Sequence, residues 1–177
     1  MKQLSERIAD RIVSIPDYPT KGVIFRDIMP VSSDAELFRD IILALAQLHR
    51  EQRIDAVVGI ESRGFIFGGA LAHALGCGFV PVRKAGKLPR ETIYEKYQLE
   101  YGEGIVEIQK DALSAGARVV LMDDLLATGG TVNAAARLVA RLGAETVASD
   151  FLVELGFLHP RGNLVSCGTV TSLLTYQ

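Results

Sequence analysis

VVLMDDLLATGGT, at residues 119–131, joins a run of apolar residues to two adjacent carboxylates and then to a turn of threonine and glycine. An unbroken apolar run of this kind is typical of a strand that is buried on both faces, as in a parallel sheet. The segment that follows, Thr131 to Leu142, places apolar side chains at helical spacing and stops at Gly143. The stretch therefore predicts a buried strand whose carboxyl end passes directly into an amphipathic helix.

The same alternation of strands and helices continues on both sides of this unit. Apolar runs predict strands at residues 55–60, 79–82, 105–108, 118–122 and 145–153, and apolar periodicity predicts helices at 4–15, 37–48 and 66–75. A further apolar segment, residues 164–174, closes the chain. This order predicts an α/β fold with a doubly wound, mainly parallel sheet flanked by helices. Ligands in such sheets lie at the carboxyl ends of the strands.

The helix over residues 37–48 is expected to begin at a capping box, SDAE at residues 33–36. In such a box the Ser33 hydroxyl accepts a hydrogen bond from an early backbone amide of the helix. The Glu36 side chain reaches back to the start of the same turn, so that two otherwise unpaired amides are satisfied.

The length of 177 residues fits a single domain over residues 1–177, and no repeat, low-complexity segment or linker divides it. Residues 83–104 stand apart, because they are rich in lysine, arginine, glutamate and tyrosine and show no clean period. A polar stretch of this length inside a compact domain is typical of a functional lid or a mobile loop. We therefore expect a mobile loop over residues 83–104.

The composition, 49% hydrophobic and 23% charged, is that of a globular protein and excludes intrinsic disorder. The net charge of −2 argues against duplex DNA as the main partner, since proteins that bind DNA usually carry an excess of basic residues. Cys77 and Cys167 have neither metal-ligand nor disulfide spacing, which favours free thiols in a reducing cytoplasm. The uncharged run at residues 64–82 is broken by GCG at 76–78, so a helix and a strand explain it better than a membrane span.

The turn at residues 128–131 has the composition of a phosphate cradle. Gly129 and Gly130 let backbone amides approach an anion closely, Thr128 and Thr131 add hydroxyl donors, and the following helix directs its positive dipole end at the site. The chain contains no GxxxxGK[ST] sequence, so the turn is not a Walker loop. The glycines at 76 and 78 are not followed by a third at the spacing of a dinucleotide fingerprint.

The acid pair, Asp123 and Asp124, sharpens this reading. Two carboxylates beside a phosphate would repel it if they pointed at it, but they suit the 2′ and 3′ hydroxyls of a ribose, or a metal ion. A ribose 5-phosphate, held by its phosphate and by its diol, fits both halves of the segment. The alternative is a helix-capping aspartate and a solvated aspartate before an ordinary glycine-rich turn.

The segment resembles the phosphoribosyl pyrophosphate signature of type I phosphoribosyltransferases. Four further segments resemble adenine phosphoribosyltransferases and follow in that family's order over essentially the whole chain: PDYPTKGVIFRDI at 16–28, ESRGF at 61–65, RKAGKLP at 83–89 and LEYG at 99–102. The resemblance implies a purine salvage enzyme that makes AMP and pyrophosphate from adenine and phosphoribosyl pyrophosphate. It also implies an N-terminal hood over residues 1–32 that contributes the base site, and a homodimer. The small-residue helix over 66–75 could pack against the partner subunit.

The same resemblance assigns substrate-binding residues in three groups. Phe25 offers a flat ring for stacking on adenine, backbone groups around Ile24 and Arg26 pair with the edge of the base, and Asp27 orients Arg26 by an ion pair. Pyrophosphate binding is assigned to Ser62 and Arg63. Arg83, Lys84 and Lys87 could add positive charge there, and the alternative is that these three residues form a solvated loop face. Ribose 5-phosphate falls to Asp123, Asp124, Ala127, Thr128, Gly129, Gly130 and Thr131.

Catalysis is assigned by resemblance to Glu100, Tyr101 and Arg63. Glu100 could act as the acid or base that handles a proton of adenine, and otherwise serves only to hold the loop. Mg²⁺ is expected as cofactor, held mainly by substrate and water, so that no metal site made of protein ligands alone is expected.

Two other functions stay open on the sequence. One is a phosphoribosyltransferase for hypoxanthine, guanine, xanthine or orotate, and the other is a non-catalytic regulator that senses phosphoribosyl pyrophosphate and binds nucleic acid. The acidic balance and the lack of room for a DNA-binding module disfavour the regulator. Of the histidines, His73 is expected to be packed or at a subunit contact, and His49 and His159 are expected at the surface.

Overall fold

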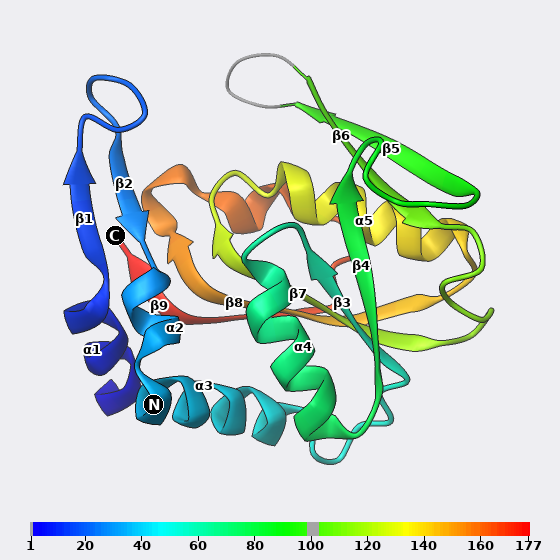
Figure 1. The fold of residues 1–177 in the computed structure, drawn as a ribbon, viewed down its shortest axis with the longest axis horizontal. Coiled ribbons are helices and arrows are strands. Elements are labelled where there is room, and N and C mark those ends of the chain that lie inside the picture. Colours follow the sequence, from blue (N-terminus) through cyan, green and yellow to red (C-terminus); the bar gives the residue numbers. More distant parts are fainter. Residues whose placement is uncertain (1, 99–102) are drawn as a thin grey trace.

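The computed structural model describes residues 2–98 and 103–177, which form a seven-stranded sheet with helices on both faces and a separate two-stranded sheet (Figure 1). The large sheet has the order β5-β6-β4-β3-β7-β8-β9. Neighbouring strands from β4 to β9 in this order run parallel, whereas β6 runs antiparallel to β4 and β5. The strands are β3 (Ala56–Ile60), β4 (Gly78–Lys84), β5 (Thr92–Gln98), β6 (Glu103–Gln109), β7 (Arg118–Leu126), β8 (Glu145–Leu155) and β9 (Thr169–Tyr176).

Helices cover the two faces of this sheet in separate layers, which confirms the expected doubly wound α/β fold (Figure 1). One face carries α5 (Gly130–Arg141), and the other carries α1 (Lys2–Arg11), α3 (Ala35–Leu48) and α4 (Gly64–Leu75). Successive side chains of β3 serve the two layers in turn, with Val58 toward α5 and Val57 toward α3 and α4.

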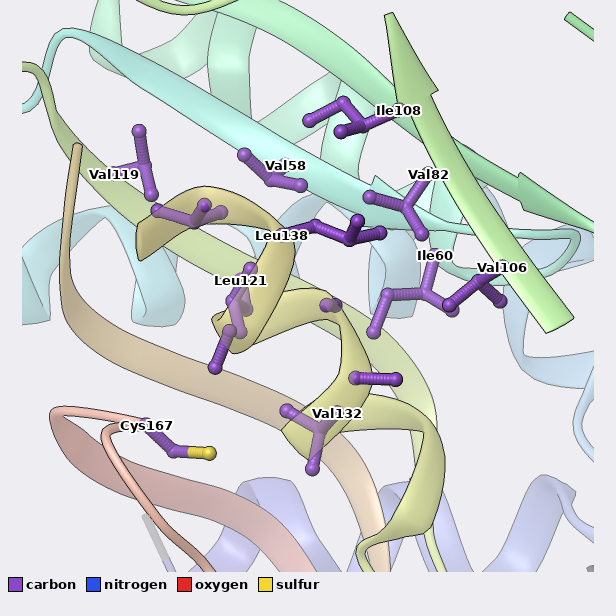
Figure 2. Close-up of a cluster of buried hydrophobic side chains, with 14 of the residues drawn as sticks. Val58, Ile60, Val82, Val106, Ile108, Val119, Leu121, Val132, Leu138 and Cys167 are labelled. Atoms are coloured by element: carbon purple, nitrogen blue, oxygen red, sulfur yellow. The ribbon is translucent and has the colours of Figure 1, made fainter. Parts of the chain in front are cut away.

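The core beneath α5 is formed mainly by valine, isoleucine, leucine and alanine side chains of the sheet and the helix (Figure 2). Leu121 of β7 and Leu138 of α5 are almost completely buried there. Burial of a side chain of this size contributes about 1.5–3 kcal/mol. This packing holds the amino end of α5 against the carboxyl end of β7, where the acid pair and the glycine turn lie.

The N-terminal segment forms the small sheet beside the main one. β1 (Val13–Pro16) pairs antiparallel with β2 (Ile24–Asp27), and the short helix α2 (Met29–Ser33) leads from β2 toward α3. The sequence periodicity extends the first helix to residue 15, which is wrong, because the helix ends at Arg11 and Ile15 lies in β1 opposite Phe25. A hydrophobic repeat over so few residues cannot distinguish the last helical turn from a strand.

The start of α3 differs from the expected capping box by one residue. Asp34 is the N-cap, and its Oδ1 accepts a hydrogen bond from the backbone N–H of Leu37 at 3.1 Å. Ser33 belongs to α2 instead, where its hydroxyl donates to the backbone oxygen of Pro30. Aspartate and serine cap equally well, so the sequence alone did not decide between adjacent candidates.

Among the described residues, part of the expected loop over residues 83–104 forms a β-hairpin, and residues 83 and 84 belong to β4. β5 and β6 pair antiparallel, with Tyr97 opposite Gly104. Ile93, Glu95 and Tyr97 are half-buried and alternate with exposed residues along β5, and Thr92 at its start is half-buried as well. A charged residue therefore interrupts the inward face and hides the strand period. Glu95 is neutralised there by Arg137 at 3.0 Å and Arg141 at 2.8 Å, both from α5. The hairpin is thereby joined to the helix that follows the glycine turn.

The uncharged run at residues 64–82 forms α4 and β4, as expected. Within the described part of the chain, no helix has the length and hydrophobicity needed to cross a bilayer. Cys77 and Cys167 are both free thiols, as expected.

Candidate active site

Several of the predicted site residues lie where β3 and β7 end side by side. These two strands are parallel neighbours, with Gly59 opposite Met122, so the segments that follow them leave the sheet at the same edge. Ser62 and Arg63 follow β3 and lead into α4, while Asp123 and Asp124 lie near the end of β7 before α5. Gly64 makes this approach possible, because a Cβ at that position would lie 2.6 Å from the Met122 oxygen and 3.0 Å from Asp123 Oδ1.

The glycine turn encloses a cavity of about 70 Å³ at the amino end of α5. Gly129 caps the helix with a φ of 88°, a left-handed conformation that favours glycine. Free amides at a helix N-terminus attract anions, so the cavity has the chemistry of a phosphate site. Its lining contains every residue predicted for the cradle together with one of the two carboxylates: Asp123, Leu125, Leu126, Ala127, Thr128, Gly129, Gly130, Thr131, Val132 and Phe151.

The two carboxylates of the acid pair lie in different environments. Asp123 lines the cavity, and its Oδ1 accepts a hydrogen bond from the backbone N–H of Asp124 at 2.9 Å. Asp124 is 4% exposed, and its Oδ2 lies 2.8 Å from Arg63 Nε. Burial, reinforced by the adjacent charge of Asp124, raises the pKa of Asp123 well above its usual range. The sequence predicts the same role for both aspartates. In the structure only Asp123 lines the cavity, whereas Asp124 forms an ion pair with Arg63.

Arg63 contacts both the ribose segment and the base segment. Besides its ion pair with Asp124, its guanidinium carbon lies 5.5 Å from the centre of the Phe25 ring. The Phe25 ring also meets the Tyr18 ring edge to face, with 5.2 Å between centroids. The structure thus brings the predicted adenine residue, the predicted pyrophosphate residue and the acid pair into one contiguous set.

Arg26, the next residue of the base segment, points to the other side of β2. Its Nη1 donates to the Ser14 hydroxyl, and its guanidinium carbon lies 4.1 Å from the centre of the Tyr176 ring. The predicted Arg26–Asp27 ion pair is wrong, since Asp27 Oδ1 accepts instead from the backbone N–H of Met29 at 2.9 Å. That bond satisfies a free amide at the start of α2, a need that the sequence did not reveal.

Glu61 is a site residue that the sequence analysis missed. It directly follows β3, its side chain is 7% exposed, and it lies 3.3 Å from Arg83 Nε and 2.5 Å from Lys87 Nζ. It also accepts a hydrogen bond from the backbone N–H of Lys84 at 2.9 Å. Burial alone raises the pKa of Glu61, but the hydrogen bonds from Lys87, Lys84 and Arg83 outweigh it and lower the pKa to about 2. Two of the predicted pyrophosphate cations, Arg83 and Lys87, therefore pair with this carboxylate. A lone acid before SRG was the only signal for it in the sequence.

Substitution of Glu61 by glutamine is expected to reduce stability in a pH-dependent way. Because the folded-state pKa lies near 2 and the ordinary value is 4.5, the stabilising charge is fully present above about pH 4.5 and is lost as the pH falls toward 2. The difference in urea unfolding midpoint between wild type and Glu61→Gln should therefore shrink on acidification. Glu91→Gln, which removes an exposed partner of Lys110, serves as control and should change little at any pH. A deficit that does not depend on pH would contradict the assignment.

The histidines show one clear departure from expectation. His49 is buried, and its Nε2 lies 2.6 Å from Asp150 Oδ2 in the middle of β8, so the expectation of a surface position is wrong. The end of α3 packs against the sheet. The sequence gives no sign of this, because a polar residue at a helix terminus is usually exposed. His73 is exposed rather than packed, and His159 is exposed as expected. Glu100 and Tyr101, the remaining predicted catalytic residues, lie outside the described residues.

A mainly parallel sheet with a glycine turn at a helix N-terminus, an acid pair and clustered cations at one edge is the arrangement expected of a phosphoribosyltransferase. In agreement, the phosphoribosyl transferase domain family matches residues 33–161. The chain belongs to the adenine phosphoribosyltransferases within this family, because relatives of that name match it over almost its whole length. The adenine phosphoribosyltransferase of Anaeromyxobacter dehalogenans (strain 2CP-C) is 52% identical over 98% of this chain and 100% of its own. The adenine phosphoribosyltransferase of Parvibaculum lavamentivorans is 54% identical over 96% of this chain and 98% of its own.

Solved structures agree with the sequence relatives. The crystal structure of adenine phosphoribosyltransferase from Rhodothermus marinus matches with a TM-score of 0.94 and 48% identity, over 99% of this chain and 100% of its own. The enzyme from Saccharomyces cerevisiae, complexed with an imino-altritol bisphosphate and adenine, matches with a TM-score of 0.92 and 42% identity, over 98% and 100%. The family and fold predicted from the sequence are confirmed.

Proposed function

We propose that the chain transfers the 5-phosphoribosyl group from phosphoribosyl pyrophosphate to N9 of adenine, which gives AMP and pyrophosphate in purine salvage. The observation that carries the proposal is the position of Arg63. Its side chain contacts Phe25 on one side and Asp124 on the other, so a base on Phe25 and a ribose beside the acid pair would meet at this residue. The reacting atoms of the two substrates, N9 and the anomeric carbon, would therefore be neighbours.

The donor binds by its two phosphoryl ends. The 5-phosphate occupies the cradle formed by Ala127, Thr128, Gly129, Gly130 and Thr131, and the ribose hydroxyls lie toward Asp123. Its pyrophosphate lies toward Ser62, Arg63, Arg83, Lys84 and Lys87. In the free enzyme Asp124 and Glu61 hold three of these cations, so the donor competes with two carboxylates for them. This arrangement keeps the cations in place before the donor arrives.

The transfer breaks the bond between the anomeric carbon and pyrophosphate, whose oxygen keeps the electron pair. N9 of adenine forms the new bond to the same carbon and loses its proton. A transition state of oxocarbenium character is expected, so catalysis rests on positioning and on neutralising the leaving group. Glu100 is proposed to handle the adenine proton and Tyr101 to cover the site.

Adenine is selected at β2. Stacking on Phe25 would contribute about 1–3 kcal/mol, and the edge of β2 that does not pair with β1 offers backbone groups around Ile24 and Arg26. A 6-oxopurine presents reversed donors and acceptors there, and a mispaired buried polar group costs about 1–3 kcal/mol. The adenine named in the Saccharomyces cerevisiae complex, and the 9-deazaadenine in that of Giardia lamblia, support a base site of this kind.

Mg²⁺ fits this donor set as a partner of the substrate. Asp123 and Asp124 supply hard oxygen atoms, and the described residues gather no group of three or more acidic, histidine or cysteine side chains around one point. We propose pyrophosphate, ribose oxygens and water as its main ligands, with the Asp123 carboxylate beside them. When bound, the ion neutralises charge on the leaving pyrophosphate.

A homodimer is proposed through the exposed face of α4. Ile66, Gly69 and His73 lie at helical spacing on that face, and Ile66 and the nearby Phe79 are each 37% exposed. Sedimentation equilibrium should then give about twice the chain mass of 19.2 kDa. The free thiols of Cys77 and Cys167 support a reducing cytoplasmic location.

A base panel tests the function. The protein is incubated with labelled phosphoribosyl pyrophosphate, Mg²⁺ and, in turn, adenine, hypoxanthine, guanine, xanthine and orotate. We expect labelled AMP and pyrophosphate with adenine, and loss of turnover when Mg²⁺ is chelated. Product with another base but none with adenine would reject the proposal. Tight, salt-sensitive DNA binding without turnover would instead indicate the regulator.

A further inference from the structure

We propose that Tyr176 is a positioning residue of the adenine site, acting through Arg26. This inference rests on the proposed function, which assigns adenine to β2. The Arg26 guanidinium lies over the Tyr176 ring, 4.1 Å from its centre, and also donates to the hydroxyl of Ser14, its cross-strand neighbour in β1. Tyr176 lies at the end of β9, so this contact joins the small N-terminal sheet to the large one.

The small sheet needs such an attachment. Two-stranded hairpins are at best marginally stable in water, and the four residues of β1 are all exposed. Ile24 of β2 is 56% exposed as well. Few apolar contacts therefore fix the position of this hairpin against the rest of the molecule. Contacts of its polar side chains contribute correspondingly more to that position.

The two faces of β2 are held by different partners. Side chains alternate along a strand, so Phe25 points toward Arg63 while Arg26 points toward Tyr176. Arg63 is proposed to engage pyrophosphate during the reaction, which draws it away from its free-enzyme contacts. Tyr176, in contrast, is not among the residues proposed to bind a substrate. Its contact with Arg26 can therefore persist throughout turnover and keep β2 in a fixed position.

Tyr176 is itself well anchored. It is half-buried, stands opposite Leu155 of β8 in the sheet, and packs against the core on the α1 and α3 face. β8 in turn pairs with β7, which carries the acid pair. The path from Tyr176 to the ribose segment thus runs through paired strands, so the ring sets where the base strand lies relative to the donor. Small displacements between reacting atoms lower rates strongly.

Steady-state kinetics of two Tyr176 variants test the proposal. Tyr176→Leu removes the aromatic face and should raise the KM for adenine about fivefold, the effect of one half-buried cation–π contact. The KM for phosphoribosyl pyrophosphate should stay within about twofold, because the cradle lies on β7 and α5. Tyr176→Phe keeps the ring and should restore the wild-type KM for adenine. Phe157→Leu, which removes an exposed aromatic side chain near β9, is the matched control and should change neither constant.

A double-mutant cycle shows whether Tyr176 acts through Arg26. Arg26→Met should raise the KM for adenine, and adding Tyr176→Leu to it should raise the constant no further, because the contact is already lost. Additive effects would overturn the proposal. So would an adenine KM that Tyr176→Leu leaves unchanged, or a rise in both substrate constants by the same factor.

Hydrogen exchange gives a readout that does not need activity. Amides of residues 24–28 should exchange faster in Tyr176→Leu than in wild type or Tyr176→Phe, while amides of β7 stay unchanged. If the base panel rejects adenine but this pattern is found, the proposed function has failed and the attachment of β2 stands. If adenine is the substrate and exchange at 24–28 does not change, the role of Tyr176 is refuted.

Discussion

Replacing Asp123 and Asp124 together by asparagine is expected to raise the KM for phosphoribosyl pyrophosphate by about 100-fold or more. Hydrogen bonds to a charged group are worth roughly 1.5–3 kcal/mol each, and about 1.4 kcal/mol corresponds to a tenfold change in affinity. The double variant removes a charge beside the cradle and the partner of Arg63. Asparagine has the same shape as aspartate, so the fold should persist, as urea unfolding can verify. Unchanged kinetics would refute the role of the acid pair in binding the diol.

The single variants separate two roles. Asp123→Asn should act on the donor directly, whereas Asp124→Asn should act by releasing Arg63. Because burial and the neighbouring charge raise the pKa of Asp123, its carboxylate becomes protonated at a higher pH than usual. Donor affinity should then fall as the pH is lowered through that pKa, and this dependence should vanish in Asp123→Asn. Asp111→Asn, an exposed carboxylate paired with Arg90, is the control and should leave the donor KM unchanged.

Replacing His49 by alanine is expected to lower the free energy of unfolding by about 3–5 kcal/mol near neutral pH. His49 and Asp150 are 3% and 0% exposed, so the histidine is the partner of a fully buried carboxyl group. Removing one member leaves the other buried and unpaired, which is far more costly than losing the contact itself. Urea or thermal unfolding measures the effect. Arg50→Ala, at the exposed position next to His49, is the control and should change stability by less than about 0.5 kcal/mol.

The pH dependence of this loss has a definite sign. Burial raises the pKa of Asp150, and the contact with His49 opposes that rise, so removal of the histidine moves the pKa further upward. A raised pKa means that the folded state is favoured by protonation and loses stability as the pH rises through that value. The deficit of His49→Ala should therefore be larger at about pH 8 than at about pH 5. A deficit that grows on acidification would contradict the buried pair.

Sequence patterns identified those parts of the fold whose determinants are contiguous. The buried strand β7, the glycine turn and the helix α5 lie in one segment, and the parallel connection places that segment at the ligand edge of the sheet. The sequence predicts a strand at residues 105–108, within β6, but its partner β5 escaped prediction. The reason is that Glu95 of β5 faces inward and is compensated by Arg137 and Arg141 of a helix much later in the chain. The alternation of apolar and polar residues along a strand indicates which side chains are buried only where the buried side chains are apolar.

By itself the sequence predicted the α/β class from apolar periodicity, the family from the resemblance of its motifs, and the glycine turn from Ala127 to Thr131, which lines the cavity at the start of α5. These features depend on residues that are close together in the chain. Only the tertiary structure decided which charged groups meet. Arg83 pairs with Glu61 across 22 residues, and His49 with Asp150 across 101. Such partners are chosen by strand order and helix packing, because a buried charge is stable only where the fold delivers a counter-charge to it.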